Sequence, residues 1–90
     1  MTEAEVQVVK LDGMLDVASC EGVANRLIAV EGSVSVDLAR VSFIDSTGLG
    51  QLVTAWRQKV SEGNRLQVIN AQGHARALFE IAGLQELLGD

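Results

Sequence analysis

The chain has 90 residues, of which 48% are hydrophobic, and its formal net charge is −5. This length and composition predict a single domain over residues 1–90 with a small, mostly aliphatic core. No run of Lys or Arg forms a basic stripe, which argues against nucleic-acid binding. Cys20 is the only cysteine, which excludes an internal disulfide and a zinc ligand set.

The elements follow from the spacing of apolar residues. In chain order we expect a strand at 6–11, a helix at 17–30, a strand at 33–38, a helix at 46–62, a strand at 65–69, a helix at 72–82 and a short helical turn at 84–88. Gly13 and Asp16 are expected to bracket a turn after the first strand. Strands that alternate with helices through short connections predict parallel strands joined by right-handed crossovers.

The fold class is therefore α/β, with a central, mostly parallel sheet and helices packed mainly on one face. Ser33, Ser35 and Asp37 alternate with apolar residues, which predicts a polar or only thinly covered opposite face. Three strands are few for such a sheet, so an edge is expected to be exposed or covered by a partner.

Two helices carry residues whose burial matters for function. The helix at 46–62 has an apolar stripe that we expect to face the core, formed by Leu49, Leu52, Val53, Trp56 and Val60. His74, the only histidine, falls on the polar side of its helix and is expected to be solvated.

No apolar run approaches the ~20 residues that a membrane-spanning helix needs. The acidic start, residues 1–5, lacks the pattern of a secretory signal. We therefore expect a cytoplasmic protein with no direct membrane insertion, and nothing in the sequence calls for a metal or a cofactor.

The most informative segment is residues 41–50, which read VSFIDSTGLG. An apolar run ends in an acid, two hydroxyls and two glycines, so Ser46 lies at the N-cap or in the first turn of a helix, where backbone N–H groups are unpaired. The positive end of the helix dipole favours a phosphate there. Asp45 can cap the helix or orient the Ser46 hydroxyl, while Gly48 and Gly50 leave room for a partner near the backbone. The same residues are also ordinary helix-capping chemistry.

The chain resembles the STAS domain, and within it the anti-sigma factor antagonists of bacteria. The resemblance rests on Val36-Asp37-Leu38 followed by residues 43–50, on residues 13–16, and on residues 64–68 and 79–84. It spans residues 6 to 88, and the Asp-Ser-Thr-Gly-Leu block is its most specific part.

The resemblance implies that Ser46 is a phosphoacceptor, with Thr47 as the second candidate. The implied partner is a GHKL-type serine kinase, often itself an anti-sigma factor, and a PP2C-type phosphatase would reverse the mark. Unphosphorylated protein would bind the kinase and free a sigma factor or another output, whereas phosphorylated protein would let go. The partner-binding or switch-flanking residues that this implies are Asp16, Asp45, Thr47, Gly48, Leu49 and Gly50.

The chain departs from the family pattern at its start. STAS domains usually carry an extra N-terminal strand, and the five residues before Val6 are too few for a strand and a turn. We expect that edge strand to be missing or rearranged, which favours a homodimer through the open sheet edge.

Two other functions compete with the switch. The protein would otherwise be a constitutive STAS adaptor, in a phospholipid-transport ABC complex or a sensory scaffold, and the serine at position 46 favours the switch over this adaptor. A small hydrolase ranks third, because Ser46 is not in a Gly-x-Ser-x-Gly elbow.

Overall fold

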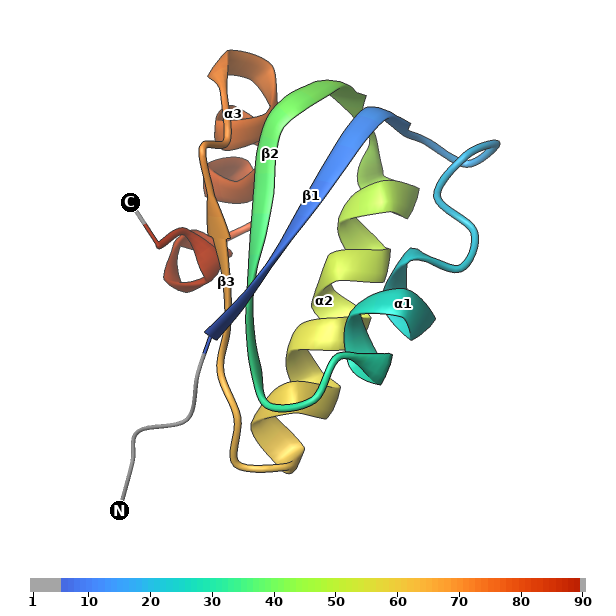
Figure 1. Ribbon diagram of the computed structural model, residues 1–90. Helices are drawn as coiled ribbons and strands as arrows, with labels where there is room; N and C mark the ends of the chain where they lie inside the picture. Colours follow the sequence, from blue (N-terminus) through green and yellow to red (C-terminus); the bar gives the residue numbers. More distant parts are fainter. Residues whose placement is uncertain (1–5, 90) are drawn as a thin grey trace.

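The computed structural model of the protein describes residues 6–89 (Figure 1). Its elements in chain order are β1 (Val6–Leu15), α1 (Val23–Ala29), β2 (Ser33–Ile44), α2 (Ser46–Ser61), β3 (Leu66–Ile69), α3 (Gly73–Ile81) and a 3₁₀ turn, η1 (Gln85–Leu87). This confirms the expected α/β class and the alternation of strands with helices.

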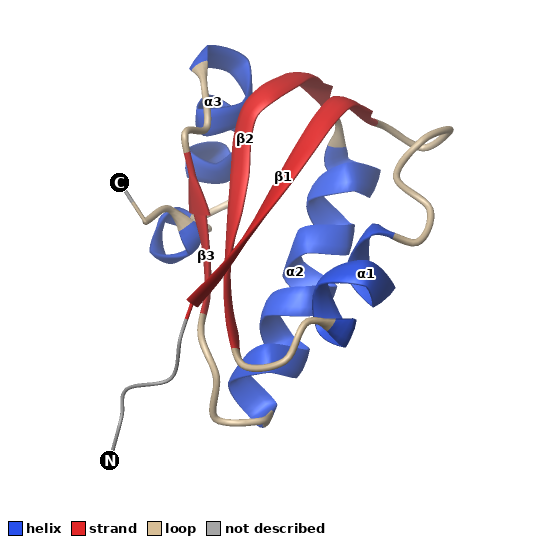
Figure 2. Ribbon diagram, viewed as in Figure 1, coloured by secondary structure: helices blue, strands red, loops and turns tan. Residues whose placement is uncertain are grey.

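The sheet consists of three parallel strands in the order β1-β2-β3 among the described residues. Figure 2 shows α1 and α2 together on one side of the strands, with α3 and η1 beside β3. Leu27, Val36, Leu52 and Phe79 are fully buried and come from α1, β2, α2 and α3 in that order, and all belong to one cluster. The helices therefore bury their apolar faces against the same face of the sheet, as expected.

The opposite face of the sheet carries Val8, Ser35 and Gln67, which are neighbours in register across the three strands. Val8 is 56% exposed. Ser35 is buried because the Gln67 amide lies over it and donates a hydrogen bond to its Oγ at 2.9 Å. The thin cover predicted for this face thus comes from neighbouring side chains within the sheet.

Both long strands extend further than predicted. β1 continues to Leu15 and β2 to Ile44, so the expected turn at Gly13 is wrong. Gly13 lies inside β1 with φ +77°, at a register shift against β2. A glycine at such a bulge lets the strand bend and keep pairing. The N-terminal segment 1–5 and the family's extra strand lie outside the described residues.

The first helix is shorter than predicted. The helix expected at 17–30 covers only α1. Gly22, with φ +85°, comes directly before the helix, and the Asp16 side chain accepts hydrogen bonds from the N–H groups of Ala18 and Ser19 in the preceding turn. None of the helices within residues 6–89 has the length and apolarity to cross a bilayer.

The helix α2 begins at Ser46 as predicted, but its buried face differs from the prediction further along the helix. The buried residues of α2 are Gly48, Leu49, Leu52, Ala55 and Lys59. Trp56 is only half-buried at the margin of the core, and Val60 is 55% exposed. The predicted core positions of Trp56 and Val60 are therefore wrong. Their neighbours Ala55 and Lys59 are buried in the core instead.

Candidate functional site

Ser46 is the first residue of α2, and one residue, Asp45, separates it from the end of β2. Its side chain is exposed, as is that of Thr47. The N-cap is Asp45, whose backbone is extended and whose Oδ1 accepts a hydrogen bond from Gly48 N–H at 2.9 Å. Ser46 thus occupies the first turn of the helix, and its hydroxyl makes no hydrogen bond with the described part of the chain.

Asp45 also ties the start of α2 to the end of β1. Its Oδ2 accepts a hydrogen bond from Val17 N–H at 3.2 Å, and its own N–H donates to Leu15 O at 3.2 Å. Of the two roles considered for Asp45, the structure gives it the capping role. The Ser46 hydroxyl is left free to point outward.

Asp16 organises the turn that Asp45 contacts. Its Oδ1 accepts hydrogen bonds from the Ser19 hydroxyl at 2.7 Å and from the N–H groups of Ser19 and Ala18 at 3.0 and 3.1 Å. The Ser19 hydroxyl, followed by these N–H groups, lowers the pKa of Asp16 below its ordinary value. These contacts therefore stabilise the ionised carboxylate, and the turn places Val17 next to Asp45.

We expect Ser19→Ala to raise the pKa of Asp16, because it removes the largest stabilising contact of the carboxylate. A group with a lowered folded-state pKa adds stability above its unfolded pKa, and this is lost as pH falls through the folded pKa, here below about pH 4. A ¹³C NMR titration of the Asp16 carboxyl measures the shift, with Ser61→Ala as the control. An Asp16 titration curve that is the same in both variants would contradict this role of Ser19.

Gly48 and Leu49 shape the site from the inside. An ideal Cβ on Gly48 would lie 2.0 Å from Leu15 O, so only glycine lets α2 begin directly on the end of β1. Leu49 is 6% exposed and belongs to the core. A Cβ on Gly50 would meet open space. Only Gly50 therefore leaves room at the surface as expected, whereas Gly48 faces inward.

Three exposed apolar side chains that the sequence analysis did not single out lie near this turn. Met14 and Phe43 are register partners on β1 and β2, and Val17 follows the end of β1. Their exposed fractions are 49%, 40% and 73%, in that order. Exposed apolar groups gathered at one site indicate an interaction surface. We call this set, Met14, Val17, Phe43, Ser46 and Thr47, the switch surface.

His74 supports the switch surface from α3. Its ring stacks on Phe43, with centroids 5.2 Å apart, and its Nε2 donates to Ile44 O at 2.9 Å. The side chain is exposed, as predicted, and these two contacts fix its orientation. No group of His, Cys, Asp and Glu side chains within residues 6–89 is arranged to hold a metal ion.

A family model described as "Mlab, STAS domain" matches residues 2–89. The chain belongs to the STAS domain family. It is 33% identical over 92 residues to an anti-sigma-B factor antagonist of Staphylococcus epidermidis, which covers 98% of this chain and 85% of the relative. It is 32% identical over 89 residues to the anti-sigma-B factor antagonist of Bacillus subtilis, which covers 96% of this chain and 81% of the relative.

Solved structures agree with this assignment to the STAS family. The anti-sigma factor antagonist SpoIIAA in its unphosphorylated form matches with a TM-score of 0.80 and 26% identity, over 100% of this chain and 83% of that chain. The Bacillus SpoIIAA in its phosphorylated form matches with a TM-score of 0.73 and 27% identity. The match covers 100% of this chain and 86% of that chain. A sulfate transporter family protein from Wolinella succinogenes shares the fold, with a TM-score of 0.72 and 23% identity. This match covers 93% of this chain and 71% of that chain. The resemblance to anti-sigma factor antagonists is thereby confirmed.

Proposed function

We propose that the protein is an anti-sigma factor antagonist controlled by phosphorylation of Ser46. Unphosphorylated, its switch surface binds a GHKL-type serine kinase that also serves as the anti-sigma factor, and a sigma factor is set free. Phosphate on Ser46 ends that contact, and a PP2C-type phosphatase restores it. The observation that carries the proposal is an exposed serine hydroxyl without a structural hydrogen bond, next to exposed apolar side chains at a helix start.

A phosphate on Ser46 is compatible with the fold. Asp45 occupies the N–H of Gly48, which leaves other N–H groups of the first turn of α2 available to phosphate oxygens. The half-buried Asp45 carboxylate would repel the phosphate and favour its outward orientation. The similarity to SpoIIAA in both the unphosphorylated and the phosphorylated form supports a fold that tolerates this change.

The same phosphate would disrupt partner binding. It brings about −1.5 to −2 charges to a surface on which Met14, Val17 and Phe43 are exposed. A partner that covers these apolar groups would have to bury the phosphate or leave it unpaired, and either is costly. Release of the partner therefore needs no rearrangement of the antagonist itself.

We expect Ser46→Ala to abolish phosphorylation and to retain kinase binding. The free energy of unfolding should change by less than about 0.5 kcal/mol, because Asp45 rather than Ser46 caps the helix. Ser46→Asp, a partial mimic with less charge than phosphate, should reduce the affinity for the kinase. The measurement is intact-protein and peptide mass spectrometry after incubation with the kinase and ATP, followed by titration of both forms with the kinase.

Thr47→Ala is the matched control and should still accept one phosphate. Phosphate on Thr47 alone would move the acceptor by one residue. Phosphate only outside Ser46 and Thr47, or equal kinase affinity of the phosphorylated and unphosphorylated forms, would overturn the switch and leave the constitutive adaptor as the better function.

A homodimer through the open sheet edge stays a prediction. β1 pairs with β2 on one side only among the described residues, so its other edge is the candidate surface for a second copy.

A further inference from the structure

A second surface, away from Ser46, lies between α2, β3 and the C-terminal segment. It is a groove of about 530 Å³. Trp56 and Val60 of α2 form one wall, and Glu86 and Leu88 form another. Trp56 follows Ser46 by ten residues, which places it about 15 Å along the helix axis.

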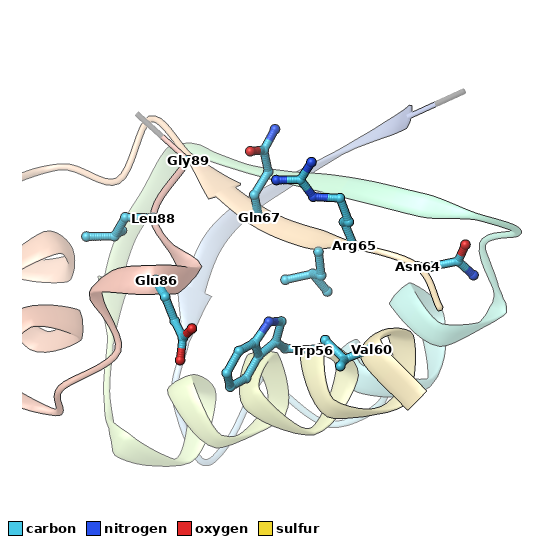
Figure 3. A pocket seen from close by; sticks show the side chains of 9 residues that line it. Trp56, Val60, Asn64, Arg65, Gln67, Glu86, Leu88 and Gly89 are labelled. Atoms are coloured by element: carbon cyan, nitrogen blue, oxygen red, sulfur yellow. The ribbon is translucent and has the colours of Figure 1, made fainter. Parts of the chain in front are cut away.

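The groove presents an aromatic ring beside a carboxylate. Figure 3 shows the Trp56 indole rising from α2 with Glu86 beside it, while Arg65 and Gln67 point away on the other side of β3. Glu86 is exposed and makes no ion pair with any residue in the described range 6–89. An indole face next to an unpaired carboxylate fits the head group and stem of a Lys or Arg side chain.

The backbone edge of β3 borders the same groove. The C=O of Arg65 is directed toward β2, where it accepts from Val34 N–H at 2.9 Å. Because backbone groups alternate along a strand, those of Leu66 point to the outer edge. The C-terminal segment joins that edge only at Val68, through Gly89 N–H at 2.7 Å. The Leu66 N–H and C=O therefore face the groove with no hydrogen bond within the described chain.

We propose that this groove binds an extended, basic peptide segment of a partner protein, which adds as a strand to the β3 edge at Leu66. One Lys or Arg of the segment lies over Trp56 and pairs with Glu86. Main-chain hydrogen bonds supply affinity and the basic side chain supplies specificity in this mode of recognition. The net charge of −5 favours a basic partner over an acidic one. The site is separate from the phosphorylation switch and does not depend on it.

The probe is the capped peptide acetyl-Thr-Val-Lys-Val-Thr-amide, with the same peptide carrying Glu in place of Lys as its counterpart. Trp56 is the only tryptophan, so intrinsic fluorescence reports on the groove directly. We expect saturable binding of the Lys peptide with a dissociation constant below about 1 mM, weakened by salt. In ¹H–¹⁵N NMR spectra the Leu66 amide should shift on binding.

Glu86→Gln should weaken binding about fivefold or more, whereas Glu80→Gln, an exposed acid on α3 outside the groove, should leave it unchanged. Ser46→Asp should bind the peptide as the wild type does, which separates this site from the switch. Equal binding of the Glu peptide, no saturation, or an unchanged affinity in Glu86→Gln would overturn the proposal. Leu66 shifts that depend on protein concentration without peptide would identify a second copy as the occupant and overturn it as well.

Discussion

Replacing Gly48 by alanine is expected to lower the free energy of unfolding by about 3 kcal/mol. The added Cβ would lie 2.0 Å from Leu15 O, a backbone atom that cannot turn aside as a side chain can. Leu15 O also accepts the hydrogen bond from Asp45 N–H, so its retreat would loosen the junction of β1 with α2. Urea unfolding followed by circular dichroism measures the loss.

Gly50→Ala is the matched control, two residues further along the same helix. A Cβ on Gly50 meets nothing within 4 Å, and alanine is favoured over glycine inside a helix by up to about 1 kcal/mol. We therefore expect Gly50→Ala to be neutral or stabilising. Equal stabilities of the two variants would show that α2 does not start against Leu15 in solution.

The position of the switch turn could be predicted because its chemistry is local. An acid with an N-capping side chain follows an apolar run, and glycine appears where the helix meets β1, so Asp45 and Gly48 mark the start of α2 in the sequence itself. The sequence could not predict that Gly48 packs against the backbone and Gly50 faces open space, because this depends on where Leu15 lies in the fold.

The apolar part of the switch surface was missed for a related reason. Met14 and Phe43 belong to the ends of β1 and β2, beyond two register shifts. A strict alternation of apolar and polar residues stops at such bulges, although the pairing of strands continues. The sequence pattern therefore ended both strands early and left these residues in loops.

The buried face of α2 was predicted correctly at Leu49 and Leu52, but further along the helix Ala55 and Lys59 are buried in place of Trp56 and Val60. Hydrophobic periodicity counts Lys as polar, so it selected Val60 as inward over its neighbour Lys59. A long side chain with an apolar stem can be buried when its ammonium finds acceptors. Those acceptors are the carbonyls of Ile28 in α1 and of Val30, its C-cap, which lie 31 and 29 residues away in sequence. No local pattern reveals them.

Lys59→Ala is expected to lower the free energy of unfolding by about 3–5 kcal/mol. The Lys59 side chain is 1% exposed, and its Nζ donates hydrogen bonds to Val30 O and, at 3.4 Å, to Ile28 O. Both carbonyls lie at the C-terminal end of α1, where a cation also interacts favourably with the helix dipole. Alanine would leave a cavity and two carbonyls without their donor.

Two further variants separate these causes. Lys59→Met keeps most of the volume and loses only the donors, so its cost should be about 1–3 kcal/mol. Arg57→Ala, an exposed cation two residues earlier on α2, should change stability by less than about 0.5 kcal/mol. Hydrogen exchange should accelerate in α1 more than in α3 in both Lys59 variants, because Lys59 joins α1 to α2. If Lys59→Ala is as stable as Arg57→Ala, the ammonium lies in water, and α1 is held by its apolar contacts alone.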